Sequence, residues 1–346
     1  MTISTSVYQL NADRPDEATI SLASRTILAG GLVAFPTETV YGLGAKALSE
    51  AAVAKIFAAK GRPPTDPLIA HIADFEQLPQ IAINLPAIAR QLASHFWPGP
   101  LTLVLHKSAR VPANLTAGLD SVAVRMPDHP VALSLLRAVA VPIAAPSANL
   151  FSRPSPTSAQ HVLDDLAGRV DVVLDAGNTP IGVESTILSL LHDPPCVLRP
   201  GGVPLEALRS VMPDIRYETR FVGEEVAASS PGSLLRHYSP RARVLLFSGL
   251  DEAKVFAAMR AEITRRERVG VIVSAADARQ FTGLDVAIEC LGADSGQAAA
   301  RLFAGLRALD KRGLNFILAR APEKKGLGLA LWDRLLRASV GSLIEV

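Results

Sequence analysis

Lys60 and Arg62 stand on either side of a single glycine in the stretch AKGRPPTDPLIAHI. Cations held in a fixed geometry are what phosphate oxygens require, and the prolines that follow restrict the backbone of this segment. Lys60 alone also fits a residue that complements the dipole at a helix C-terminus, and Arg62 alone fits a solvated loop. Together the two residues favour a preorganised loop that binds an anion.

Several other segments carry polar side chains beside apolar runs. Ser147 and Asn149 follow the run VPIAAP with a spacing of two, which points both side chains the same way at a predicted strand end. Turn hydrogen bonds after Pro146 explain this pair equally well. The stretch FPTETVYGLGA offers hydroxyls and backbone N–H groups, or an ordinary glycine-rich turn.

Two arginines and one group of hydroxyl residues can likewise be interpreted either as part of a ligand site or as ordinary structural residues. Arg125 interrupts an apolar strand and Arg199 ends another, so each fits either a ligand site or a solvated strand position. The residues of GVEST stand at the entrance to a strand, where a local turn is a sufficient explanation. Only the combination of these segments with the cationic loop indicates a site.

The residue types exclude several chemistries. The sequence has no Ser-His-Asp, Cys-His or paired-carboxylate pattern, which leaves anion binding and group transfer rather than covalent or glycosidase catalysis. The two cysteines are far apart and the seven histidines lack metal-ligand spacing, so no zinc site is indicated. A formal charge of +2 gives no broad footprint for nonspecific nucleic-acid binding.

Alternating helical and strand patterns predict an α/β protein of about two domains. A helix is expected from about Asp16 to the Gly30-Gly31 pair, followed by a buried strand at LVAF. A second helix starts at the N-cap Ser49 and ends where Gly61 suits the left-handed position. Further strands are expected at LTLVL, VAVRM, VPIAA, VDVVLDAG, STILSLL and CVLRPGG, with helices near 130–138 and 157–168.

The chain divides, on this pattern, into a domain at 1–213, a linker at 214–242 and a smaller domain at 243–346. The last part alternates the strands RVLLF, RVGVIVSA, DVAIECLG and LNFILARA with helices at 251–266, 295–312 and 328–338, which is typical of βαβ units on a parallel sheet. It lacks G-x-G-x-x-G, and the whole chain lacks G-x-x-x-x-G-K-[ST]. The N-terminal stretch lacks a basic region and an apolar core, so no targeting segment is expected.

The ordered motifs PTETVYGLGA, KGRPPTDPLIAHI, FWPGPLTLVL, VAVRMPDHP, APSAN, RPSPT, GVEST and LRPGG resemble those of L-threonylcarbamoyladenylate synthases. SPGSLLRHYSP resembles the linker of the long, two-domain form, and GLGLALWDRLLRAS resembles the end of its second domain. The resemblance implies a YrdC-like domain with a twisted, largely mixed sheet and a basic cleft. A Rossmann-like α/β domain would follow the linker.

The resemblance also implies a reaction. L-Threonine, bicarbonate and ATP would give threonylcarbamoyl-AMP and pyrophosphate, as the first step toward N6-threonylcarbamoyladenosine at position 37 of tRNA. Mg²⁺ would arrive with ATP, with no metal site of the protein's own. The product would pass to the tRNA threonylcarbamoyl transferase machinery of the cytoplasm, without a membrane, and direct tRNA binding is left open.

Family positions assign the substrates by residue. Lys60 and Arg62 would act on the ATP phosphates as catalytic residues. The rest of the ATP site would be Asp66, Ser121, Ser147, Asn149, Ser155, Arg199 and Tyr238. Threonine would be held by Thr37, Thr39, His71, Arg125, Ala145 and Ser185, with Arg125 as the partner of its carboxylate.

Three departures from the family pattern touch the binding loops. Asp66 stands where Asn is common, which would add negative charge near the phosphates. Phe151 and Ser152 alter the turn that leads to Arg153. The linker lacks the usual Met-Lys-Tyr before its histidine, and we expect this linker to close over the cleft as a lid.

Three alternatives stay open from the sequence. The first is a noncatalytic RNA-binding protein, which the low net charge and the missing RNA motifs disfavour. The second is a carbamoyl-transfer enzyme of hydrogenase maturation, which lacks support because the expected zinc-finger cysteines are missing. The third is a nucleotide-dependent sensor whose second domain acts as the reader.

Overall fold

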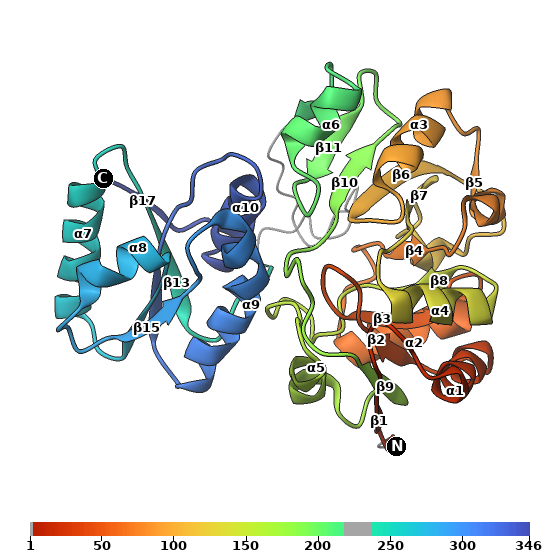
Figure 1. The fold of residues 1–346 in the computed structure, drawn as a ribbon, viewed down its shortest axis with the longest axis horizontal. Coiled ribbons are helices and arrows are strands. Elements are labelled where there is room, and N and C mark those ends of the chain that lie inside the picture. Colours follow the sequence, from red (N-terminus) through yellow and green to blue (C-terminus); the bar gives the residue numbers. More distant parts are fainter. Residues whose placement is uncertain (1–2, 218–236) are drawn as a thin grey trace. The chain divides into compact units, whose positions relative to one another are not determined.

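The chain forms two compact units in a computed structural model, which describes residues 3–217 and 237–346. Unit 1 comprises Met1–Phe151 and Ser155–Leu234, and unit 2 comprises Ser152–Pro154 and Leu235–Val346 (Figure 1). The domain boundaries predicted at 213 and 242 stay predictions. Residues 218–236, most of the linker that we expect to act as a lid, lie outside the described part of the chain, so the lid stays a prediction.

Unit 1 is built on a large mixed sheet, as the resemblance implied. Its strands have the order β1-β9-β2-β3-β8-β4-β7-β6-β10-β11-β12, and β5 pairs with β6. The strands are β1 Ser6–Gln9, β2 Val33–Phe35, β3 Gly42–Lys46, β4 Ile69–His71, β5 Ala82–Ile83, β6 Leu101–Lys107, β7 Ser121–Arg125, β8 Ile143–Ala144, β9 Val172–Asp175, β10 Thr186–Ser189, β11 Cys196–Arg199 and β12 Arg216–Tyr217. The helices are α1 Glu17–Leu28, α2 Glu50–Lys60, α3 Ala87–Phe96, α4 Pro130–Val139, α5 Ala159–Leu166 and α6 Leu205–Val211.

Local sequence signals define the two helices nearest the N-terminus. The Asp16 carboxylate accepts a hydrogen bond from the Thr19 N–H and caps α1. The Ser49 hydroxyl caps α2, and Gly61 ends that helix with φ 64°, a conformation that glycine adopts without strain. Both helices begin and end where the sequence predicted, and the end of α2 fixes the start of the cationic loop.

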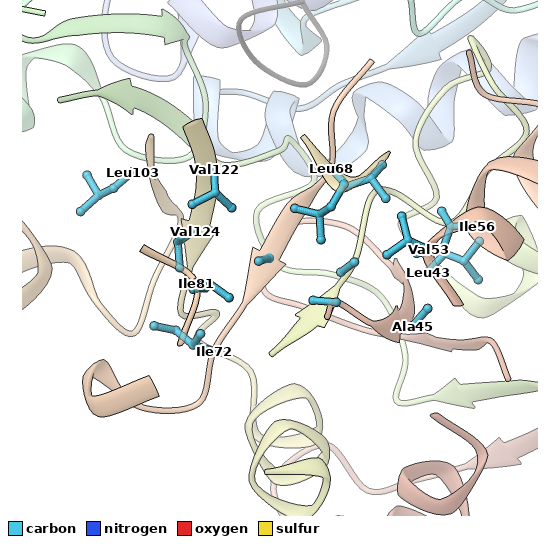
Figure 2. Packing of buried hydrophobic residues seen from close by; sticks show 14 of the residues in the cluster. Leu43, Ala45, Val53, Ile56, Leu68, Ile72, Ile81, Leu103, Val122 and Val124 are labelled. Carbon is cyan, nitrogen blue, oxygen red and sulfur yellow. The ribbon is translucent and has the colours of Figure 1, made fainter. Parts of the chain in front are cut away.

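The core of unit 1 holds α2 against the sheet. Val53 and Ile56 of α2 pack close to Leu43 of β3, and Val122 and Val124 of β7 belong to the same buried cluster (Figure 2). These side chains are essentially inaccessible to solvent. Burial of each large aliphatic side chain contributes about 1.5–3 kcal/mol to folding, so the packing anchors both the helix that ends at Lys60 and the strand that ends at Arg125.

Strand β3 was not predicted, because its sequence GLGAK reads as a glycine-rich turn. It pairs antiparallel with β2 and with β8. A Cβ at Gly44 would lie 2.8 Å from Cε1 of Phe35, so the position requires glycine for close packing rather than for a turn. Tertiary packing therefore overrides the local turn signal here.

Unit 2 contains a parallel sheet, as predicted, with the four predicted strands and a fifth, β17, that was not predicted. The order is β15-β14-β16-β13-β17, and every pairing in it is parallel. The strands are β13 Arg243–Ser248, β14 Val269–Val273, β15 Ala287–Cys290, β16 Phe316–Arg320 and β17 Leu343–Glu345. The helices are α7 Glu252–Arg265, α8 Ala275–Ala278, α9 Ser295–Lys311 and α10 Gly328–Ala338, which match the three predicted helices and add the short α8.

The helices of unit 2 cover both faces of its sheet. Figure 1 shows α7 and α8 on one face and α9 and α10 on the other. This is the arrangement of a doubly wound, Rossmann-like fold. Within the described residues, no helix is long and apolar enough to cross a membrane.

Candidate active site

The cationic loop is buried and tied to its own backbone. Arg62 donates from Nε to the Asp66 carbonyl at 3.0 Å and from Nη2 to the Pro67 carbonyl at 2.8 Å. Its guanidinium also forms an ion pair with the Asp66 carboxylate at 2.9 Å, and both side chains are buried. Three contacts thus fix the plane and position of this guanidinium. From the sequence alone, a solvent-exposed Arg62 was an equally good interpretation.

Lys60 links the loop to the segment after β8. Its ammonium lies within hydrogen-bonding distance of the Ser147 carbonyl at 2.5 Å and donates to the Asn149 carbonyl at 2.7 Å. The Lys60 carbonyl accepts from the Phe151 N–H in return. The structure therefore brings Lys60, Ser147 and Asn149 together across 87 to 89 residues of chain.

Ala145, Ser147 and Asn149 follow β8 in a hydrogen-bonded segment, in which Ala145 and Asn149 are buried and Ser147 is partly exposed. The Ala145 N–H donates to the Ile69 carbonyl, and Ser147 forms an isolated bridge with Gly42. The neighbouring Ala148 N–H donates to the Tyr41 carbonyl. These bonds set the segment against β4 on one side and the start of β3 on the other.

Arg125 lies at the centre of a second polar cluster. In the sheet register it stands beside His71 of β4 and Thr102 of β6. Its guanidinium donates to the Thr39 hydroxyl at 2.9 Å and forms an ion pair with Glu38 at 2.6 Å. Arg125 is only 4% exposed, so its charge acts in a medium that screens it much less than water does.

Thr37 and Thr39 join this cluster through their hydroxyls. The two oxygens lie 2.8 Å apart, and the Thr37 hydroxyl donates to the Val40 carbonyl. The Thr37 oxygen also accepts from the N–H groups of Thr39 and Val40. The segment between β2 and β3 is thus a hydrogen-bonded turn that presents Thr39 to Arg125.

Ser185 and Arg199 meet on neighbouring strand ends. The Arg199 guanidinium donates to the Ser185 carbonyl at 2.9 Å and to its hydroxyl at 3.2 Å. The Ser185 hydroxyl lies 2.7 Å from the Thr102 hydroxyl, on the residue that pairs with Arg125. A continuous chain of polar contacts therefore runs from Arg199 to the neighbourhood of Arg125.

Ser155 is held by a carboxylate. Its hydroxyl lies 2.5 Å from Oε1 of Glu184, and Ser155 itself is fully buried. Glu184 immediately precedes Ser185 in the chain. This contact links the segment that carries Ser155, between β8 and α5, to the segment that carries Ser185, between β9 and β10.

The two remaining residues predicted for the ATP site are Ser121 and Tyr238. Ser121 begins β7, so about 13 Å of strand separate it from Arg125. It lines a small hollow beside Pro67, whose carbonyl accepts from Arg62. Tyr238 is fully buried in unit 2, where it contacts Phe303 and Arg334, and its assignment to the ATP site stays a prediction.

Three buried residues with structural roles in the site were not assigned from the sequence. Glu38 pairs with Arg125, Glu184 holds Ser155, and Thr102 contacts Ser185. The signal for the two glutamates is their position beside hydroxyl residues: Glu38 lies between Thr37 and Thr39, and Glu184 directly precedes Ser185. Thr102 gives no such signal, because threonine is common in strands.

Burial keeps His71 neutral. Loss of solvent, reinforced by the nearby Arg125 charge, lowers the pKa of the His71 imidazole to about 3. Its Nδ1 is buried and has no hydrogen-bond partner in the described part of the chain. A neutral imidazole beside a guanidinium can exchange a hydrogen bond with a polar ligand without adding charge.

The depressed pKa of His71 predicts a stability loss in acid. In the unfolded chain histidine titrates near 6.5, so between that pH and about 3 the unfolded state binds the extra proton. Below pH 6.5 the free energy of unfolding should therefore fall, by up to about 1.4 kcal/mol per pH unit from this residue. Urea unfolding from pH 7 to 4 should show a shallower pH slope for His71→Gln.

His106→Gln offers the matched control for the substitution itself. His106 lies on β6 but is exposed. Its replacement should leave the free energy of unfolding at pH 7 unchanged. An unchanged slope in His71→Gln would contradict a neutral, buried His71.

Gly201 shapes the loop that carries Ser185. A Cβ at this position would lie 2.3 Å from the Glu184 carbonyl oxygen and 2.5 Å from the Ser185 carbonyl oxygen. Gly201→Ala should therefore lower the free energy of unfolding by about 1–3 kcal/mol, as overpacking does, and should also lower activity. Gly296→Ala is the control, because its nearest neighbour is a side-chain oxygen at 3.2 Å, and it should not lower stability in urea unfolding.

The described residues hold no group of three or more His, Cys, Asp or Glu side chains suited to a metal ion. The donors that converge in unit 1 are guanidinium, ammonium, hydroxyl and backbone groups. Such a set binds phosphate or carboxylate oxygens and positions them for reaction. It supplies no activated nucleophile of the protein's own.

Two family models match the chain. The Sua5, YciO and YrdC model, described as "Telomere recombination", matches residues 25–201. The model described as "Threonylcarbamoyl-AMP synthase, C-terminal domain" matches residues 203–340. The two matches together follow the order of the sequence motifs.

Curated relatives and solved structures agree with these models. Threonylcarbamoyl-AMP synthase of Pyrococcus abyssi is 48% identical over 96% of this chain and 98% of its own length. The Bacillus subtilis protein of that name is 42% identical over 94% of each. The crystal structure of P. abyssi Sua5 complexed with L-threonine matches with a TM-score of 0.92 and 46% identity, over 99% of both chains.

A more distant structure shares the fold of part of the chain. Escherichia coli YciO matches with a TM-score of 0.53 and 24% identity, over 57% of this chain and 96% of its own. The two P. abyssi matches extend over nearly all of this chain, whereas the YciO match covers 57% of it. The chain belongs to the family of the threonylcarbamoyl-AMP synthases, in the form that joins a Sua5/YciO/YrdC domain to the C-terminal domain.

Proposed function

We propose that this protein forms L-threonylcarbamoyl-AMP and pyrophosphate from L-threonine, bicarbonate and ATP. The observation that carries the proposal is the pair of buried cationic clusters in unit 1, one around Arg62 and one around Arg125. The first suits the phosphates of ATP, and the second suits an amino acid carboxylate. The full-length relatives named threonylcarbamoyl-AMP synthase support the same reaction.

The reaction requires positioning and charge stabilisation. The threonine nitrogen forms a C–N bond to bicarbonate carbon and water leaves, which gives the carbamate. A carbamate oxygen then attacks the α-phosphorus of ATP as the bond to the bridging oxygen of pyrophosphate breaks. Lys60 and Arg62 offset negative charge on the phosphates, and Mg²⁺ arrives as part of the ATP substrate.

In this proposal Arg125 holds the threonine carboxylate. Thr39 and Glu38 orient the guanidinium, since both contact it directly. Neutral His71 and the Ser185 hydroxyl line the same end of the sheet, from β4 and from the start of β10. Ser147, Asn149, Ser155 and Arg199 extend from this cluster toward the nucleotide, in accordance with the family assignment.

The product is a mixed carbamic–phosphoric anhydride, which reacts readily with amines. We place its consumer in the tRNA threonylcarbamoyl transferase machinery, and the enzyme in the cytoplasm. This part of the proposal rests on the chemistry of the product and on the family.

Pyrophosphate release tests the reaction. ATP should give pyrophosphate only when both L-threonine and bicarbonate are present, and L-valine, which lacks the hydroxyl, should replace threonine poorly. Release without threonine would favour the nucleotide-sensor alternative. Salt-dependent RNA binding with no pyrophosphate release would favour the RNA-binding alternative.

A further inference from the structure

Unit 2 contains a cavity of about 600 Å³ that the proposed reaction does not use. Its walls come from residues that follow three strands: β14, β15 and β16. The volume is within the usual range for sites that bind small organic molecules. Every lining residue belongs to unit 2, so the cavity is a property of that unit.

The cavity lies where a doubly wound sheet places its ligands. The chain leaves β14 toward its edge neighbour β15, but it leaves β16 toward β17 on the other side of β13. The helices that follow, α8 and α10, cover opposite faces of the sheet (Figure 1). The carboxyl ends of β14 and β16 therefore flank a topological switch point, where open parallel sheets form a crevice.

The inner walls of the cavity are apolar. Ile272 lies next to the final residue of β14, Leu291 follows β15, and Leu331 and Leu335 come from α10. Ala298 of α9 contributes a small side chain where a larger one would enter the space. An apolar slot of this kind accepts a ring system.

The polar groups of the cavity are mainly acceptors. Asp277, Asp294 and Glu323 line it together with Arg320 and Lys325, which leaves one net negative charge on these lining residues. The Arg320 guanidinium is already engaged, because it forms ion pairs with Asp277 at 2.9 Å and with Glu252. This balance disfavours a polyanion, and the sequence has neither of the standard phosphate loops.

Carboxylates at the ends of parallel strands are suited to hydroxyl donors. In doubly wound folds such an acid accepts hydrogen bonds from ribose hydroxyls. Asp294 follows β15, and it is anchored at the N-terminus of α9 because its Oδ1 accepts from the Gln297 N–H at 2.8 Å. Asp277 is fixed across the cavity by Arg320.

We propose that this cavity binds a ribonucleoside. The base lies between the apolar walls from β14 and α10, and the ribose hydroxyls donate to the carboxylates. The uncharged nucleoside is preferred over its triphosphate, because the charged lining residues carry one net negative charge and Arg320 is already paired with carboxylates. The proposal concerns unit 2 alone and does not depend on the reaction proposed for unit 1.

Methyl NMR on the full-length protein tests the site. With labelled Ile and Leu methyl groups, adenosine should cause saturable shifts at Ile272, Leu291 and Leu331. 2′,3′-Dideoxyadenosine, which lacks the hydroxyl donors, should bind at least about tenfold more weakly, since each well-made polar contact contributes about 1.4 kcal/mol or more. ATP should also shift these three methyl groups less at equal concentration. Shifts at unit 1 methyls, such as Leu43, report separately on any binding there.

Matched variants give the control. Ala298→Phe should abolish the unit 2 shifts by filling the slot, whereas Ala300→Phe, on the same helix but outside the lining, should leave them intact. Asp294→Asn keeps a capping oxygen for α9 but removes the charge, and it should weaken adenosine binding.

Three results would overturn the proposal. The first is that none of adenosine, guanosine, cytidine and uridine causes saturable shifts at these methyls. The second is that 2′,3′-dideoxyadenosine binds with the same affinity as adenosine. The third is that Ala298→Phe and Ala300→Phe have equal effects on the unit 2 shifts. If the protein released no pyrophosphate in response to threonine, that result would count against the reaction proposed for unit 1. It would not bear on the NMR test of unit 2.

Discussion

Replacement of Arg62 by alanine should lower the rate of pyrophosphate release by about 100-fold or more. In the proposed site this guanidinium stabilises charge on the phosphates as pyrophosphate leaves, and removal of one such preorganised donor typically costs 10²–10³ in rate. Two carbonyls and the Asp66 carboxylate hold it in place. Steady-state measurement with saturating threonine, bicarbonate and ATP gives the effect on turnover.

Two controls separate this effect from damage to the loop. Arg62→Ala also removes the ion partner of Asp66, so the double variant Arg62→Ala/Asp66→Ala should be as inactive but more stable than the single variant. Arg110→Ala removes an exposed cation from the same unit and should keep wild-type activity. If Arg62→Ala retained turnover within about threefold, the loop would not stabilise the leaving group.

Replacement of Arg125 by lysine should raise the KM for L-threonine by about tenfold or more, with little change in the KM for ATP. The substitution keeps the positive charge, so Glu38 keeps an ion partner, but it removes the planar fork that binds a carboxylate bidentately. A tenfold change corresponds to about 1.4 kcal/mol of binding. Separate titrations of threonine and ATP give the two constants.

The split between the two constants is the informative part of that experiment. Arg90→Lys changes an exposed arginine that stacks on Phe75, and it should alter neither constant. Equal increases in both KM values would indicate a general structural fault. A raised KM for ATP alone would move Arg125 to the nucleotide end of the site.

Local signals in the sequence were sufficient for some elements and not for others. The caps of α2 at Ser49 and Gly61 were predictable, because each depends on a few neighbouring residues. Strand β3 was not, because Gly44 is selected by the approach of Phe35 from another strand. The parallel sheet of unit 2 was predictable because its strands alternate regularly with long amphipathic helices.

Family resemblance supplied residue assignments that spacing could not. No pattern in the sequence relates Lys60 to Ser147, or Arg125 to Thr39, because these contacts form across 86 residues or more. Such pairs depend on strand order, which local periodicity does not determine. The ion pair between Arg125 and Glu38 was unexpected for the same reason.

The structure also changes how the departure at Asp66 is understood. The sequence suggested that an aspartate in place of asparagine would add negative charge near the phosphates. The Asp66 carboxylate is instead paired with Arg62 at 2.9 Å in a fully buried position. Its charge therefore serves to orient the guanidinium, which only side-chain geometry could reveal.

The most direct test of the proposed reaction is the fate of labelled bicarbonate. With ¹⁴C-bicarbonate, L-threonine and ATP, we expect one labelled product with the mass of threonylcarbamoyl-AMP, in equal amount to the pyrophosphate released. Arg62→Ala should lower both together. Pyrophosphate release without label in an adenylate, or labelled product that forms without threonine, would contradict the account.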